Sequence, residues 1–96
     1  MNLFLDIETF SSTSLLDCGL DKYAEANDFD ILLCGYAFGN DPVQVADLMH
    51  EEMPQKIIDA ILDDSITKVA HNSRFERICF SNYFKRLGLI SESLSI

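Results

Sequence analysis

Apolar and polar residues alternate along residues 1–10, MNLFLDIETF, in the pattern of a β-strand. Successive side chains of an extended strand point to opposite faces, so the apolar residues at odd positions share one face. Asp6 and Glu8 share the other face with Phe4. Because an apolar side chain lies on the same face as the two acids, we expect a mostly buried strand that carries the acids at its end.

The pattern changes after this strand. Residues 11–30 mix hydroxyl-bearing residues, Asp, Gly and Asn with short apolar patches, which predicts a long loop with one or two short helical turns. Residues 31–39 are apolar and rich in strand-forming residues, residues 40–42 (NDP) favour a turn, and residues 43–48 alternate again. The last three segments together predict a β-hairpin.

Residues 53–64 have the apolar spacing of an amphipathic helix. Pro54 fits in the first turn, where its missing N–H removes no helical hydrogen bond. Residues 66–70, ITKVA, are short and rich in β-branched side chains, which predicts a further strand. The apolar face of the predicted helix comprises Ile57, Ile58, Ile61 and Leu62.

Residues 71–88 predict a second helix. Asn72 or Ser73 can cap its start, and Gly88 can end it. The order of strand, hairpin, helix, strand and helix favours an α/β fold with a mixed sheet and helices packed against it. No repeat or linker interrupts the chain, so we expect a single domain over residues 1–96. The apolar stripe of the second helix comprises Phe75, Ile78, Cys79, Tyr83 and Leu87.

The net charge limits the ways in which this chain could bind nucleic acid. The 96 residues carry a formal net charge of −9, which argues against binding through a broad basic surface. The charge is compatible with a metal-dependent nuclease, because carboxylates gather where cations bind and the cations then contact the phosphate. The alternative interpretation is that the acidic charge only keeps the protein soluble.

The cysteines and the hydropathy bear on the cellular setting. Cys18, Cys34 and Cys79 are widely spaced and form no C-x-x-C pair, so we expect reduced, partly buried core residues. No apolar run approaches the roughly 18 to 20 residues of a membrane span. Residues 1–10 lack the basic start of a signal peptide. We therefore expect no membrane partner and a cytoplasmic location.

Three acids are candidates for chemistry. Two carboxylates side by side repel each other unless a positive group lies between them, and a divalent cation is the usual solution. If residues 66–70 form a strand parallel to the first strand, Asp6, Glu8 and Glu76 converge at the carboxyl end of the sheet. Such oxygen ligands suit Mg²⁺ or Mn²⁺. The alternatives are a solvated strand end for the first pair and a favourable helix-start charge for Glu76.

Two segments resemble a known family. FLDIET and AHNSRFE are similar to the first two motifs of the 3′-5′ exonucleases that hold two metals with four acidic residues, the DEDD superfamily. LFLDIETFSS, residues 18–48 and KVAHNSRFER together resemble the N-terminal proofreading region of phage-type family A DNA polymerases. The resemblance implies a ribonuclease-H-like mixed sheet flanked by helices and a location in the cytoplasm of a bacterial host cell.

The resemblance also implies roles for single residues. It makes Asp6, Glu8 and Glu76 the catalytic metal ligands of a two-metal Mg²⁺ or Mn²⁺ site. In the family's mechanism, one metal activates a water and the other stabilises the leaving 3′-oxygen at the 3′ end of single-stranded DNA. Supporting positions shape the start of the helix, form a wall for the base or contact the terminal nucleotide. These substrate-binding residues are Thr9, Asn72 and Phe75.

One part of the family's pattern is missing. A third motif, Tyr or His followed by Asp, lies on a helix downstream of the second motif in these exonucleases, and this sequence stops at LISESLSI before such a motif. We therefore expect a truncated, C-terminally incomplete fold, an incomplete two-metal site, and weak or no activity of the chain alone.

Two other interpretations remain open. The first is a non-catalytic prophage remnant that folds and forms a homodimer through the apolar surface that truncation exposes. The second is another ribonuclease-H-like enzyme, such as an integrase or transposase core. The D-x-E pair on one strand and the H-N-x-x-F-E segment fit this second interpretation less well.

Overall fold

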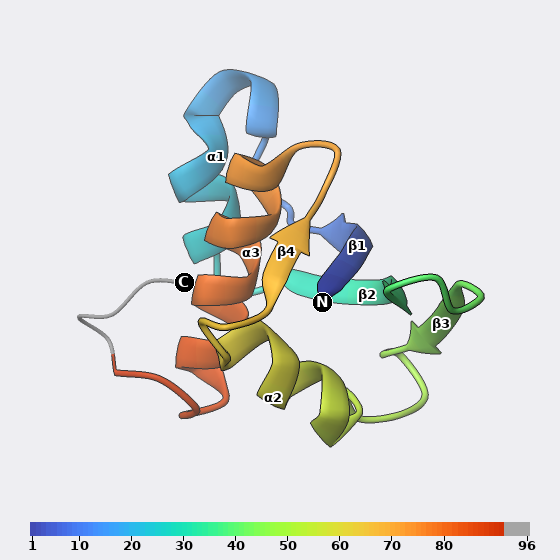
Figure 1. Cartoon of the computed structure of the whole chain (residues 1–96). Helices are drawn as coiled ribbons and strands as arrows, with labels where there is room; N and C mark the ends of the chain where they lie inside the picture. Colours follow the sequence, from blue (N-terminus) through green and yellow to red (C-terminus); the bar gives the residue numbers. More distant parts are fainter. Residues whose placement is uncertain (92–96) are drawn as a thin grey trace.

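The computed structural model describes residues 1–91 and has an α/β fold, in which three helices accompany a four-stranded mixed sheet. The strand order is β3-β2-β1-β4, with β1 antiparallel to β2 and parallel to β4 (Figure 1). The predicted α/β class, the hairpin and the parallel strand are thereby confirmed. The elements are β1 (Asn2–Phe10), α1 (Leu15–Glu25), β2 (Asp30–Phe38), β3 (Gln44–Asp47), α2 (Gln55–Leu62), β4 (Thr67–Val69) and α3 (Ser73–Arg86).

The hydrophobic core lies on one face of the sheet. Leu5 of β1 pairs with Tyr36 of β2, and Ile7 pairs with Cys34, so these side chains form adjacent rows on the face that α2 and α3 cover. Each large side chain that is fully buried stabilises the fold by roughly 1.5 to 3 kcal/mol. The largest fully buried side chains include Phe29, Phe80, Phe84, Leu3, Ile31 and Ile57.

The prediction that β1 is mostly buried is wrong. Burial alternates strictly from Asn2 to Glu8, and Phe4, which shares the face of the two acids, is 42% exposed. The cause is that α2 and α3 pack on the other face, where Leu5 lies. We call the exposed side of the sheet the open face. It carries Phe4, Asp6 and Glu8 of β1, Val45 of β3 and Val69 of β4.

The segment predicted to be a loop with one or two short helical turns contains an 11-residue helix, α1. The Ser14 hydroxyl caps this helix by accepting from the Asp17 N–H at 3.2 Å. Gly19 has a φ of 84° and divides α1 into two short pieces across a kink, which explains why no long helical pattern is visible in the sequence. The helix lies beside α3 in Figure 1.

The apolar stripe predicted for α3 is only partly correct. Phe80 and Phe84 are buried deeply against the sheet, whereas Leu87 is 51% exposed. Phe75 is half-buried and contacts Tyr23 of α1, so the helix buries two adjacent faces rather than one stripe. No helix within residues 1–91 is long and apolar enough to cross a membrane.

The cysteine prediction is confirmed for two of the three residues. Cys34 and Cys79 are fully buried, and burial is the first cause that raises the pKa of each thiol to about 12. Cys18 lies exposed on α1, contrary to the expectation of a core residue. All three are free thiols.

Candidate metal centre and nucleotide site

The first two candidate acids lie where the alternation of β1 placed them. Asp6 and Glu8 both point to the open face and both are exposed. Asp6 pairs with Gly35 of β2, where a Cβ atom would lie 3.9 Å from the Asp6 Cβ. Because Gly35 carries no side chain, the open face beside Asp6 is free of a neighbour from β2.

The third acid is positioned by the connection from β4 to α3. Val69 of β4 pairs with Phe4, so the chain leaves β4 beside the middle of β1 and turns directly into α3. The Asn72 side chain caps the helix, with its Oδ1 accepting from the Phe75 N–H at 3.3 Å. The Asn72 carbonyl accepts from the Glu76 N–H at 3.1 Å, which fixes the acid within the first turns. The predicted cap at Asn72 is confirmed.

Glu76 is buried, which is unusual for a carboxylate. Its side chain is 7% exposed, and within residues 1–91 no group donates a hydrogen bond to its Oε2 atom. Burial raises the pKa of Glu76, and the charge of Asp6 raises it further, while its own backbone N–H and His71 act in the opposite direction. A buried acceptor without a partner costs about 1 to 3 kcal/mol. The Oε2 atom is therefore available to a positive or hydrogen-bond-donating ligand.

The three acids do not all gather in one place. Asp6 raises the pKa of Glu76, so these two carboxylates interact through space. Within residues 1–91, however, no group of three His, Cys, Asp or Glu side chains is close enough to hold a metal ion. The oxygen donors and the orphan oxygen of Glu76 fit Mg²⁺ or Mn²⁺ in chemical type. The described part of the chain thus brings together the carboxylates of Asp6 and Glu76 but no group of three candidate ligands.

Thr9 and Phe75 are joined by a residue that the sequence analysis did not identify. The Thr9 Oγ1 and the Tyr23 hydroxyl lie 2.8 Å apart, at hydrogen-bonding distance. The Tyr23 ring contacts the Phe75 ring, with centroids 6.4 Å apart, and meets Phe29 edge-on at 5.9 Å. The sequence gives only a weak signal for Tyr23: residues 11–30 predict a loop with one or two short helical turns, within which Leu20, Tyr23 and Ala24 have helical spacing.

A β-bulge shifts the pairing of β1 with β2 near the end of β1. Glu8 pairs with Leu33, but Thr9 pairs with Ile31, so the register shifts between the candidate ligand and the candidate nucleotide contact. Bulges are frequent next to active sites because they redirect side chains. Thr9 points toward Tyr23 of α1, on the side of the sheet opposite to Glu8, as the alternation of a strand requires.

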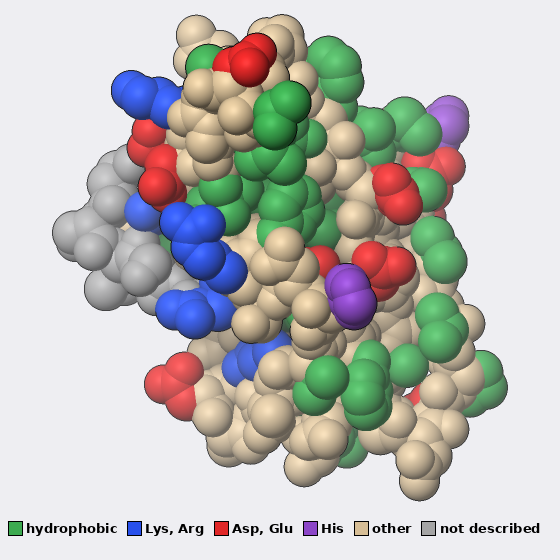
Figure 2. Space-filling model, turned by 90° about the horizontal axis from the view of Figure 1, so that it is seen from above, with side chains coloured by type: hydrophobic (Ala, Val, Ile, Leu, Met, Phe, Trp, Pro, Cys, Tyr) green, Lys and Arg blue, Asp and Glu red, His purple; other side chains and the backbone are tan. Residues whose placement is uncertain are grey.

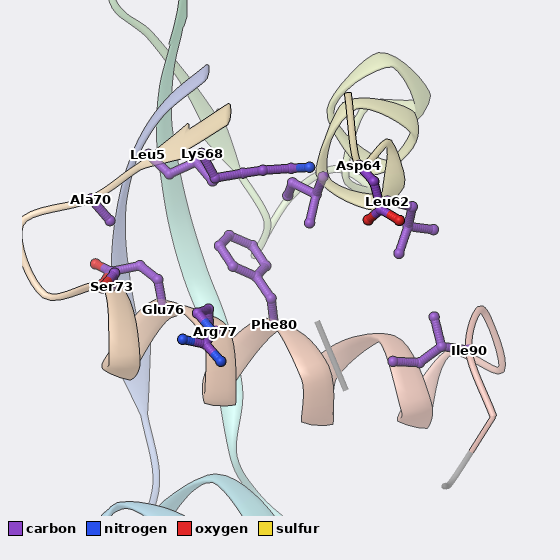
Figure 3. A pocket seen from close by; sticks show the side chains of 11 residues that line it. Leu5, Leu62, Asp64, Lys68, Ala70, Ser73, Glu76, Arg77, Phe80 and Ile90 are labelled. Atoms are coloured by element: carbon purple, nitrogen blue, oxygen red, sulfur yellow. The ribbon is translucent and has the colours of Figure 1, made fainter. Parts of the chain in front are cut away.

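A cavity of about 370 Å³ lies between α2, β4 and α3, beside Glu76 (Figure 3). Its walls are mainly apolar, from Leu5, Ile61 and Phe80, with Lys68 among the polar lining residues. Figure 3 shows the Glu76 side chain extending from the start of α3 toward the connection that follows β4. The buried carboxylate therefore lies at one end of an apolar hollow.

The Lys and Arg side chains are unevenly distributed over the molecule. Four of the seven Lys and Arg residues lie on α3, and Figure 2 shows Lys and Arg side chains gathered on one side of the molecule. Asp21 and Glu25 of α1 line the same groove as Arg74, Arg77 and Lys85 of α3. The groove therefore carries both signs of charge.

Comparison with known proteins identifies one curated relative. The chain is 45% identical over 88 residues to a DNA polymerase of Bacillus phage SP02, a match that covers 91% of this chain and 14% of that polymerase. No protein-family model matches the chain, and no solved structure matches it. The resemblance to a phage DNA polymerase is thereby confirmed, and the chain is homologous to a segment that makes up about one seventh of that protein.

Proposed function

We propose that this chain is the N-terminal part of a 3′-5′ exonuclease domain, the proofreading domain of a phage-type DNA polymerase. The observation that carries the proposal is the buried Oε2 atom of Glu76, which has no partner within residues 1–91 and lies near the charge of Asp6. A buried acid beside another acid is unfavourable for stability alone, which is the expected signature of a cation site. The homology to a phage DNA polymerase supports the same assignment.

In this proposal, Asp6, Glu8 and Glu76 hold Mg²⁺ or Mn²⁺ as part of a two-metal site. The metals would activate a water and stabilise the leaving 3′-oxygen of a phosphodiester at the end of single-stranded DNA. Asp6 and Glu8 lie on the open face, where a strand of DNA has access. Glu76 lies in the first turns of α3, which Asn72 caps, and the charge of Asp6 acts on it.

The proposed nucleotide contacts are Thr9 and Phe75, which the resemblance to the exonuclease motifs suggests. Thr9 comes directly after Glu8 and offers its backbone or hydroxyl to the terminal nucleotide. Phe75, half-buried on the first turn of α3, forms the wall against which a base packs. Aromatic rings suit this role because every base has a flat face that stacks on them.

The test is Mn²⁺-dependent shortening of single-stranded DNA labelled at its 5′ end, with three purified proteins. We expect the unmodified chain to shorten the DNA slowly from the 3′ end. Asp6→Asn is expected to abolish shortening, and the matched control Asp17→Asn, which changes an exposed acid on α1, is expected to retain it. Shortening that survives in Asp6→Asn would contradict the proposed site.

A second candidate function is a folded, non-catalytic domain that associates with another copy of itself. The absence of a three-ligand group within residues 1–91 favours this alternative, as does the exposed apolar surface of the open face. A well-folded chain that leaves the DNA intact with Mn²⁺ present would support it over the exonuclease.

A further inference from the structure

Tyr23 connects the two sequence motifs of the candidate site. Its hydroxyl is hydrogen-bonded to Thr9, at the end of the first motif, with a distance of 2.8 Å. Its ring packs against Phe75, within the second motif, with ring centroids 6.4 Å apart. A single side chain from α1 therefore contacts both of the residues that are proposed to receive the nucleotide.

The hydroxyl pair has a spare hydrogen-bonding capacity. Each hydroxyl has one proton to donate and two lone pairs, and the bond between Thr9 and Tyr23 uses only one of the two protons. Both side chains are half-buried rather than sealed in the core. The bond also selects one rotamer of Thr9, because its branched side chain has few alternatives. The pair thus presents a fixed polar group at the end of β1.

The Tyr23 ring is itself held in place. Phe29, which is fully buried, meets it edge-on at a centroid distance of 5.9 Å. Edge-on aromatic pairs are worth about 0.5 to 1.5 kcal/mol beyond the area they bury. The ring therefore provides a rigid support between the core and the exposed end of the site.

We propose that Tyr23 is a positioning residue for the terminal nucleotide: its hydroxyl orients Thr9 and its ring sets the angle of Phe75. This inference rests on the proposed function. It assigns a role to α1, which carries neither of the two motifs, in organising the nucleotide subsite. Tyr23 acts through Thr9 and Phe75 and is not itself a metal ligand.

The test uses the full chain with thymidine 5′-monophosphate and Mg²⁺, followed by NMR. The phosphorus signal of the nucleotide gives the dissociation constant for every protein. The labelled threonine methyl groups, Thr9, Thr13 and Thr67, locate the binding site in the proteins that keep Thr9. Tyr23→Phe removes only the hydroxyl. The matched control is Tyr36→Phe, which removes a hydroxyl that donates to Gln44 Oε1 at 3.1 Å elsewhere in the sheet. Thr9→Val and the double variant Thr9→Val/Tyr23→Phe complete a double-mutant cycle.

We expect the Thr9 methyl signal to shift on binding, and Tyr23→Phe to raise the dissociation constant about three- to ten-fold while the melting temperature changes by no more than about 2 °C. Thr9→Val should weaken binding similarly, and the double variant no further, because both changes break the same bond. Tyr36→Phe should bind like the unmodified chain.

Three outcomes would overturn the inference in different ways. An unchanged dissociation constant in Tyr23→Phe would remove the role of Tyr23 and leave the proposed function intact. If the fold-increases in the dissociation constant of the two single variants multiply in the double variant, Tyr23 does not act through Thr9. Failure of the unmodified chain to bind the nucleotide would overturn the proposed function, and this inference with it.

Discussion

The negative charge of Asp6 on β1 raises the pKa of Glu76 on α3, adding to the larger effect of burial. The two residues are 70 positions apart in the sequence, and the parallel pairing of β4 with β1 brings them together. A carboxylate in this situation keeps its proton to a higher pH in the folded than in the unfolded chain. Its charge state is therefore linked to folding and to any cation that binds there.

This linkage predicts a pH-dependent effect of Glu76→Gln. The pKa of Glu76 is higher in the folded than in the unfolded chain. Protonation of Glu76 therefore adds to the free energy of unfolding; this contribution is fully present below the unfolded pKa and is lost as the pH rises through the folded pKa. We expect Glu76→Gln to raise the melting temperature at pH 7.5 by roughly 2 to 4 °C, which corresponds to about 0.5 kcal/mol in a small domain. Near pH 3.5 Glu76→Gln and the unmodified chain should have the same melting temperature.

Glu51→Gln, at an exposed position, is the control for this pH experiment. Its melting temperature should equal that of the unmodified chain at both pH values. A Glu76→Gln variant that is less stable than the unmodified chain at pH 7.5 would mean that the charged form makes favourable contacts.

A second prediction distinguishes the observed from the expected packing of α3. Phe84→Ala removes a side chain that is 0% exposed and should destabilise the fold by about 3 to 5 kcal/mol. Leu87→Ala, at a position that belongs to the sequence-predicted stripe but is exposed, should change stability by less than about 1 kcal/mol. Urea denaturation followed by circular dichroism measures both. Equal losses of stability in Phe84→Ala and Leu87→Ala would show that α3 is rotated about its axis relative to this structure.

A third prediction concerns the cap that holds Glu76. Asn72→Ala removes the acceptor for the Phe75 N–H and should lower stability by about 1 kcal/mol. Asn72→Ser keeps a capping oxygen and should lose only a few tenths of a kcal/mol. Thermal melts of the two variants provide the comparison. Identical melting temperatures for Asn72→Ala and the unmodified chain would remove the role of this cap.

A fourth prediction follows from the open face. Val45 is 63% exposed, and Phe4 and Val69 lie on the same side of the sheet, so we expect weak association of two copies through this surface. Asp6 and Glu8 limit the affinity because their charges oppose each other across such a contact. Light scattering should give a mass above the 10.9 kDa monomer at high micromolar concentration, and Val45→Lys should restore the monomer. A monomer at every concentration would exclude this dimer.

Much of the fold was predictable because strong local patterns coincide with the elements. The alternation around Asp6, the isoleucines of α2 and the cap at Asn72 each specify an element without help from the rest of the chain. The open face and the kinked α1 were not predictable in this way. The open face depends on which side of the sheet the helices pack against. The kink of α1 depends on a single positive φ at Gly19.

The roles of the candidate site residues stay predictions, and the structure adds where these residues lie. The motifs predict Asp6, Glu8 and Glu76, but the burial of Glu76 depends on the tertiary structure around the start of α3, which the sequence does not display. Tyr23 escaped detection because hydrogen bonds between side chains distant in sequence have no local signature. Such contacts require the tertiary structure.

The most direct test of the metal site is paramagnetic broadening of the amide NMR signals by substoichiometric Mn²⁺, measured on the unmodified chain and on Glu76→Gln. We predict that broadening centres on Asp6, Glu8 and Glu76, and that more Mn²⁺ is needed in the variant. Broadening centred on other exposed acids, such as Asp63 and Asp64, or spread evenly over the surface, would contradict the proposed metal centre.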